Sequence, residues 1–196
     1  MYVSKYNILV GVLDQLRKEA PSQNRRYYPS DVNPEGLNDA RSRAFIHLFL
    51  KVKFGLLEFQ ERESYITDDT QDGGIDAYYI DDDMKRIYFI QSKFRTTEAN
   101  FQSKEIALSE LLQMDADRIS NGEETDERGN PYSNKIKRFI QKIREIQDIG
   151  RWKYEIIILA NLGRSVTNAH LRKLTGGFGV EVFNHERAYL DFVRFF

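Results

Sequence analysis

The sequence QDGGIDAYYIDDDMKRIYFIQSKFR, which spans residues 71–95, decides the fold. Two runs rich in β-branched and aromatic residues, at 75–80 and 86–93, flank a turn that contains three consecutive aspartates. Runs of this kind on either side of a polar turn are typical of a β-hairpin. A two- or four-residue turn centred after the third aspartate pairs Asp76 with Gln91.

The polar residues of this hairpin are expected to share one face. Opposed residues of an antiparallel pair point to the same side, and side chains alternate along each strand. Asp76, Gln91 and Lys93 therefore gather on one face, and Ser92 faces away. A carboxylate and an amide oxygen suit Mg²⁺, and a nearby lysine adds positive charge. Together these groups are typical of phosphodiester hydrolysis, in which negative charge builds up on the phosphate.

Two glycines lead into the first strand of the hairpin. Gly73 and Gly74 lack a Cβ atom, so the chain can turn sharply there, and a nucleic-acid backbone can come close to Asp76. The alternative is a purely structural hairpin in which Asp76 and Lys93 form an ordinary ion pair.

Hydrophobic patterns in the rest of the chain predict an α/β fold with a mixed sheet flanked by helices. Helices are expected at 1–20, 37–54, 101–112, 136–146, 166–174 and 185–196. Strands are expected at 57–66, 75–80, 86–93, 154–160 and 180–183. The hairpin is antiparallel, whereas the last strand-helix-strand unit should be parallel. Residues 1–36 are interpreted as an N-terminal helix and connector, and residues 37–196 as the main domain.

Composition limits the class of protein. The 196 residues, 41% of them hydrophobic and 30% charged, are typical of a folded globular chain. A formal net charge of −1 excludes a strongly basic protein that coats nucleic acid, although a local positive groove is compatible with it. The absence of cysteine excludes thiolate metal sites. The chain has no long apolar run and no signal-peptide pattern, so we expect a cytoplasmic protein without membrane contact.

The motifs GGID, at 73–76, and QSK, at 91–93, together resemble the PD-(D/E)xK nuclease superfamily. The glutamine form is typical of Mrr-type restriction-endonuclease-like domains. More narrowly, residues 66–95 resemble the N-terminal nuclease-like region of abortive-infection phage-resistance (AIPR) proteins. The resemblance implies a restriction-endonuclease-like fold and a Mg²⁺- or Mn²⁺-dependent endonuclease that cuts DNA in phage defence.

The resemblance also implies roles for individual residues. Asp76, Gln91 and Lys93 would be catalytic, and the metal ligands would be Asp76, Gln91 and the backbone carbonyl of Ser92. Weaker nucleic-acid contacts are expected from Gly73, Gly74, Arg95 and Lys104.

One feature of the superfamily is missing. Related enzymes often carry a glutamate on the helix before the sheet, but residues 43–52 contain no acid, so Asp39 or Glu58 would have to replace it. Two alternatives to a DNA nuclease therefore stay open: an inactive module that binds nucleic acid or protein, and an RNA-cleaving nuclease. A homodimer, or further domains of a longer protein, is also left open.

Overall fold

The computed structural model describes residues 4–30, 33–95, 97–99, 114–162, 169, 171–172 and 175–195. Its α-helices are α1 (Lys5–Leu16), α2 (Pro34–Phe54), α3 (Phe59–Glu63), α6 (Ala116–Ser120), α7 (Asn134–Glu145) and α9 (His185–Asp191). Its strands are β1 (Ala77–Asp81), β2 (Arg86–Ser92), β3 (Lys153–Leu159) and β4 (Gly179–Val182). Short 3₁₀ turns are η1 (Arg17–Glu19), η2 (Arg25–Tyr27), η3 (Ile149–Arg151) and η4 (Val193–Phe195).

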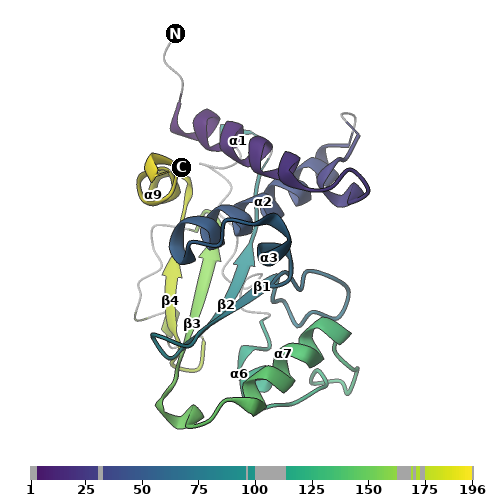
Figure 1. The fold of residues 1–196 in the computed structure, drawn as a ribbon, viewed down its shortest axis with the longest axis vertical. Helices are drawn as coiled ribbons and strands as arrows, with labels where there is room; N and C mark the ends of the chain where they lie inside the picture. Colours follow the sequence, from purple (N-terminus) through teal and green to yellow (C-terminus); the bar gives the residue numbers. More distant parts are fainter. Residues whose placement is uncertain are drawn as a thin grey trace.

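The strands form one mixed sheet in the order β1-β2-β3-β4 (Figure 1). The hairpin β1–β2 is antiparallel, and β2–β3 and β3–β4 are parallel, as predicted. Ala77 pairs with Ile90 and Asp81 with Arg86, so the predicted register is confirmed with a four-residue turn. The α/β class with a mixed sheet flanked by helices is therefore confirmed.

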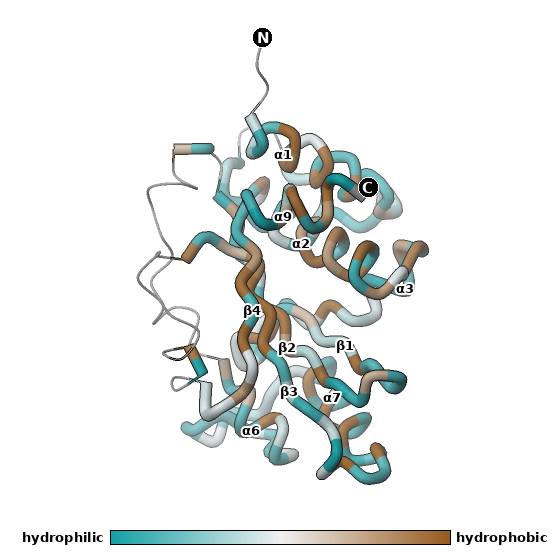
Figure 2. Tube along the Cα trace, turned by 90° about the vertical axis from the view of Figure 1, so that its left-hand side faces the viewer, coloured by the Kyte–Doolittle hydropathy of each residue, from teal (hydrophilic) through white to brown (hydrophobic). Residues whose placement is uncertain are grey.

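Each face of the sheet packs against its own layer of helices. On β2, Tyr88 and Ile90 belong to a core shared with α1, α2 and α9. The alternate residues Ile87 and Phe89 belong to a second core with α6 and α7. Figure 2 shows the hydrophobic strands between these two layers. Burial on both faces explains the nearly continuous apolar runs of β2 and β3.

Helix α2 lies across the end of β2 and supplies residues to a cavity there. Asn33 caps its start by accepting a hydrogen bond from the Gly36 N–H at 2.9 Å. It ends at Gly55, whose φ of 69° is a left-handed conformation that glycine adopts readily. In its middle, Ser42 accepts the Phe94 N–H through Oγ and the Ser92 hydroxyl through its carbonyl, both at 2.8 Å. These bonds fix α2 against the end of β2.

Two predicted elements differ from the structure. The strand expected at 57–66 is wrong: Phe59–Glu63 form helix α3, and only Ile66 makes an isolated bridge, to Ala77. The reason is the buried Arg62, whose guanidinium donates to the Leu56 carbonyl at 2.8 Å and folds the segment back on itself. Helix α6 was not expected. The helix expected at 101–112 and most of that at 166–174 lie outside the described residues.

The N-terminal helix α1 is part of the first core. Its apolar side chains Tyr6, Leu9, Leu13 and Leu16 are buried against α2 and α9. Within the part of the chain that the structure describes, no helix is long and apolar enough to cross a membrane.

Candidate functional site

A cavity of about 880 Å³ lies at the end of β2, between α2 and the loop that precedes β1. Six residues that the sequence singles out line it: Asp39, Asp76, Gln91, Ser92, Lys93 and Arg95. The other lining residues are Arg25, Arg26, Pro29, Asn33, Glu35, Gly36, Asn38, Ser42, Arg43, Ile46, Asp68, Asp69, Thr70 and Phe94. Four separate segments of the chain therefore build a single polar cavity.

Asp76 is fixed at the point where the hairpin ladder ends. Its backbone N–H donates to the Ile90 carbonyl at 2.9 Å, and its Oδ2 accepts the Ser92 N–H at 2.7 Å. Burial raises the pKa of the Asp76 carboxyl to about 8, although the hydrogen bond from Ser92 opposes the shift. The negative charges of Asp68 and Asp72 raise this pKa further. The site therefore favours added positive charge.

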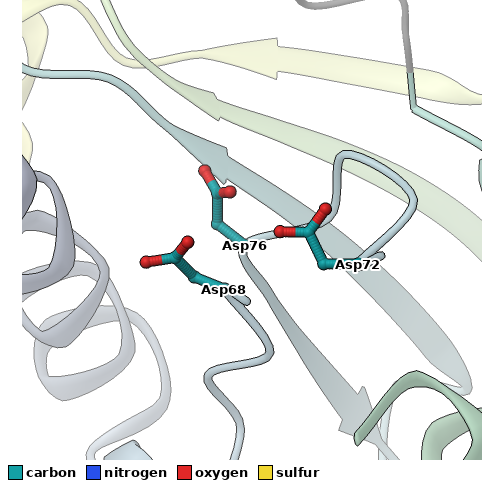
Figure 3. Close-up of side chains that lie close together, drawn as sticks. All are labelled: Asp68, Asp72 and Asp76. Atoms are coloured by element: carbon teal, nitrogen blue, oxygen red, sulfur yellow. The ribbon is translucent and has the colours of Figure 1, made fainter. Parts of the chain in front are cut away.

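Two more carboxylates point toward Asp76 (Figure 3). One oxygen from each of Asp68, Asp72 and Asp76 lies within 4.8 Å of the others. Asp68 is placed by the Asp76 carbonyl, which accepts the N–H groups of Thr67 at 2.8 Å and Asp68 at 3.0 Å. Asp72 is placed by its own Oδ1, which accepts the Gly74 N–H at 2.8 Å. We call Asp68, Asp72 and Asp76 the acidic cluster.

Asp68 and Asp72 were not predicted as site residues. Pairing of positions across the hairpin does not find them, because they reach Asp76 through a loop that folds along the outer edge of β1. The available signal was the density of acids in TDDTQDGGID, residues 67–76, because four carboxylates within nine residues repel one another unless positive charge is supplied.

A buried arginine balances part of this negative charge. Arg43 of α2 is only 4% exposed, and its guanidinium lies 2.6 Å from Asp68 Oδ2 and donates to the Asp68 carbonyl at 2.7 Å. One turn earlier on the same helix, Asp39 lines the cavity, and burial together with Asp68 raises its pKa. Glu58 is exposed at the start of α3 and does not line the cavity. Of the two acids proposed to replace the missing helix glutamate, only Asp39 is near the site.

Gln91 presents a polar atom without a partner. The residue is 5% exposed, and its buried Oε1 accepts no hydrogen bond from the residues that the structure describes. A buried carbonyl oxygen without a partner costs about 1–3 kcal/mol, so it is uncommon without a functional reason.

The other predicted contacts are placed differently. Arg95 lines the cavity, but Gly73 and Gly74 do not, and Lys104 lies outside the described residues. A Cβ atom at Gly73 would meet Ile119 Cδ1 at 3.1 Å and Tyr132 Cε1 at 3.2 Å, and its φ is +65°. Backbone conformation and close packing against protein therefore explain Gly73, without a nucleic acid.

The residues present fit a hard divalent cation. Mg²⁺ and Mn²⁺ prefer oxygen ligands, which the acidic cluster supplies, and two of its members, Asp68 and Asp76, line the cavity together with Gln91. The raised pKa of Asp76 also fits a cation-binding site, because a bound cation would stabilise the deprotonated carboxylate.

Comparisons of the chain with models of known families, with curated proteins and with solved structures find no match. The resemblance to PD-(D/E)xK and AIPR proteins therefore stays a prediction.

Proposed function

We propose that this chain is a metal-dependent endonuclease that hydrolyses DNA phosphodiester bonds. The observation that carries the proposal is that two clustered carboxylates, Asp68 and Asp76, line one cavity together with Gln91 and Lys93. Oxygen ligands for a cation beside a lysine are one combination that supports phosphodiester hydrolysis. A role in phage defence is part of this proposal and follows from the resemblance alone. A cytoplasmic location is also part of it and follows from the hydrophobic pattern of the sequence.

Asp76, Gln91 and the backbone carbonyl of Ser92 would hold Mg²⁺ or Mn²⁺, with Asp68 as a further carboxylate ligand. When bound, the cation offsets charge on the phosphate and makes water a better nucleophile. Asp76 is already oriented for this role by the Ser92 N–H, at 2.7 Å. Ser92 in turn is anchored to α2 through its hydroxyl, so the ligands have little freedom to rearrange.

The cationic side chains of the cavity would act on the phosphate itself. Lys93 would offset the charge that develops in the transition state. Arg43 is held beside the acidic cluster by Asp68 and would add to the same effect. The exposed residues Arg25 and Arg26 on η2 line the cavity and would contact phosphates further along the strand.

A second candidate is a module that binds nucleic acid or protein without cutting it. The Arg43–Asp68 ion pair favours this alternative, because a guanidinium already neutralises one carboxylate of the acidic cluster. The absence of an acid from residues 43–52 favours it too. Cleavage of RNA in place of DNA is a variant of the first proposal.

The test is a cleavage assay on plasmid DNA, single-stranded DNA and single-stranded RNA, with Mg²⁺, with Mn²⁺ and with EDTA. We expect metal-dependent cleavage of DNA, which Asp76→Asn and Lys93→Ala each lower by at least about a hundredfold. Lys153→Ala is the matched control, since it removes an exposed lysine at the first residue of β3, far along the sheet from the cavity.

Three results decide between the candidates. Cleavage by the wild type and by Lys153→Ala, but by neither site variant, supports the nuclease. Cleavage of RNA alone corrects the substrate. A folded wild-type protein that cuts no substrate with either metal supports the binding module.

A further inference from the structure

We propose that Asn38 and Arg95 form a second polar subsite in the cavity, for a hydroxyl or amide group on a nucleotide beside the scissile phosphate. The identity of the ligand as a nucleic acid rests on the proposed function. The existence of the subsite rests on the two side chains themselves.

Both side chains contain a buried polar atom that the fold leaves unpaired. Asn38 Oδ1 and Arg95 Nε have no hydrogen-bond partner among the residues that the structure describes, and both residues line the cavity. An unpaired buried donor or acceptor costs about 1–3 kcal/mol. Gln91 also contains such an atom, so three residues with an unpaired buried atom line this cavity. The simplest explanation is a group that binds in the cavity and pairs with these atoms.

The backbone already holds the two residues in place. Asn38 lies one helical turn before Ser42, whose Oγ accepts the Phe94 N–H at 2.8 Å, and Arg95 is the next residue. The Tyr6 hydroxyl donates to the Arg95 carbonyl at 2.8 Å, which ties this position to α1. A ligand would therefore meet two residues whose backbone positions are already fixed.

The chemistry of the pair selects its ligand. Arg95 Nε can only donate a hydrogen bond, and Asn38 Oδ1 can only accept one. A phosphate oxygen satisfies the arginine but offers no proton to Asn38. A group that both accepts and donates, such as a hydroxyl or an amide, is complementary to the two atoms. In a nucleic acid this group is the ribose 2′-hydroxyl or the edge of an unpaired base.

The subsite can be tested by binding, without any cleavage. Fluorescence anisotropy in EDTA would measure the Kd of wild type, Asn38→Ala and Arg95→Gln for a short labelled oligonucleotide. Three oligonucleotides of one sequence are needed: RNA, DNA, and DNA with abasic sites. Arg151→Gln is the control, because it removes the same charge from an exposed residue of η3 that does not line the cavity. Thermal melts confirm that each variant is folded. If Arg95→Gln does not fold, Arg95→Lys takes its place in the binding measurement.

We expect each subsite variant to weaken binding about tenfold, or 1.4 kcal/mol, with Arg151→Gln unchanged. A loss confined to RNA assigns the 2′-hydroxyl, and a loss that disappears on abasic DNA assigns a base edge. An equal loss on all three oligonucleotides would reveal an ordinary phosphate contact and overturn the subsite. Wild-type affinity in both variants, or no binding by the wild type, would also overturn it. A wild type that binds as expected but never cuts would overturn only the nuclease.

Discussion

At the scale of single residues, Asp76 combines two requirements that conflict while no cation is bound. The hydrogen bond from Ser92 orients a charged carboxylate, whereas burial and the neighbouring carboxylates disfavour the charge. The outcome is a pKa of about 8, so the metal-free site holds a proton at neutral pH. A cation would have to displace that proton, and we therefore expect metal binding to strengthen as pH rises.

This conflict predicts how stability depends on pH. An unfolded aspartate has a pKa of about 3.9, so between about pH 4 and pH 8 the folded state retains a proton that the unfolded state has released. In EDTA, the stability of the wild type should fall as pH rises through this window. Asp76→Asn cannot titrate, so its Tm relative to wild type should increase steadily from pH 5 to pH 8.

Thermal melts across this pH range provide the measurement. Asp83→Asn, in the exposed hairpin turn, removes the same type of charge and should run parallel to wild type. If the Asp76→Asn curve also runs parallel to wild type, Asp76 is ionised at neutral pH and the explanation is wrong.

The unpaired oxygen of Gln91 supports a second prediction at this scale. Gln91→Glu adds a negative charge beside the acidic cluster, so Mg²⁺ should bind about tenfold more tightly, or by 1.4 kcal/mol. Gln91→Leu removes the buried unpaired oxygen, so it should leave the metal-free fold at least as stable and weaken Mg²⁺ binding. Titration calorimetry measures both affinities. Equal Mg²⁺ affinity in wild type and both variants would exclude Gln91 as a ligand.

At the scale of elements, the loop before β1 shows how packing places the site. Gly73 has a φ of +65° and lies against Ile119 and Tyr132, on the α6 side of the sheet. The Asp115 N–H donates to the Gly73 carbonyl at 2.8 Å, and the Ser133 N–H donates to the Gln71 carbonyl at 2.9 Å. These contacts anchor the loop that presents Asp72 to Asp76.

A pair of glycine substitutions tests this role. Gly73→Ala should lower the free energy of unfolding by roughly 1–3 kcal/mol, because alanine is strained at positive φ and its Cβ atom meets two side chains. Gly11→Ala, in the exposed middle of α1 with nothing within 4 Å, should raise it by roughly 0.5–1 kcal/mol. Urea denaturation measures both changes. Similar effects at the two positions would contradict the packing explanation.

Helix α3 illustrates how a buried polar network overrides local pattern. Arg62 Nε donates to His47 Nδ1 at 3.0 Å, and because arginine is only a donor, the imidazole proton must be on Nε2. That nitrogen lies 2.7 Å from the Tyr27 hydroxyl, which donates to Glu63. Burial lowers the pKa of His47 and favours this neutral form. The network joins η2, α2 and α3 behind the cavity wall.

At the scale of the whole molecule, the sheet separates two cores that must form together. Because β2 contributes side chains to both cores, loss of either would expose the apolar residues of the other. Residues of η2 and of α2 line the same cavity, so the N-terminal segment and the main domain also meet at the candidate site.

This arrangement predicts cooperative unfolding. Leu13 of α1 is fully buried in the first core, and Leu13→Ala should cost about 2–5 kcal/mol. The single tryptophan, Trp152, packs against the second core, so its fluorescence reports on the opposite face of the sheet. In urea, Leu13→Ala should shift the midpoint seen by Trp152 as much as that seen by circular dichroism. A shift in circular dichroism alone would show that α1 unfolds as a separate unit.

The sequence by itself determined the hairpin, its register and the parallel pairing of the last two strands. Runs of β-branched and aromatic residues and the position of the aspartate turn are local signals, and they were sufficient to place Asp76 opposite Gln91. The strand predicted at 57–66 was wrong because Arg62 finds its partners on α2 and in η1, both distant in sequence.

Only the tertiary structure decided the composition of the site. Asp68, Arg43 and Asn38 reach the cavity, and Asp72 reaches Asp76, from a loop and a helix whose positions depend on packing against both faces of the sheet. No period or spacing in the chain encodes such contacts, because they arise when segments far apart in sequence bury their apolar faces together. Local sequence signals thus placed Asp76 opposite Gln91 at the centre of the site. The charges and unpaired groups around these two residues were determined by the tertiary structure.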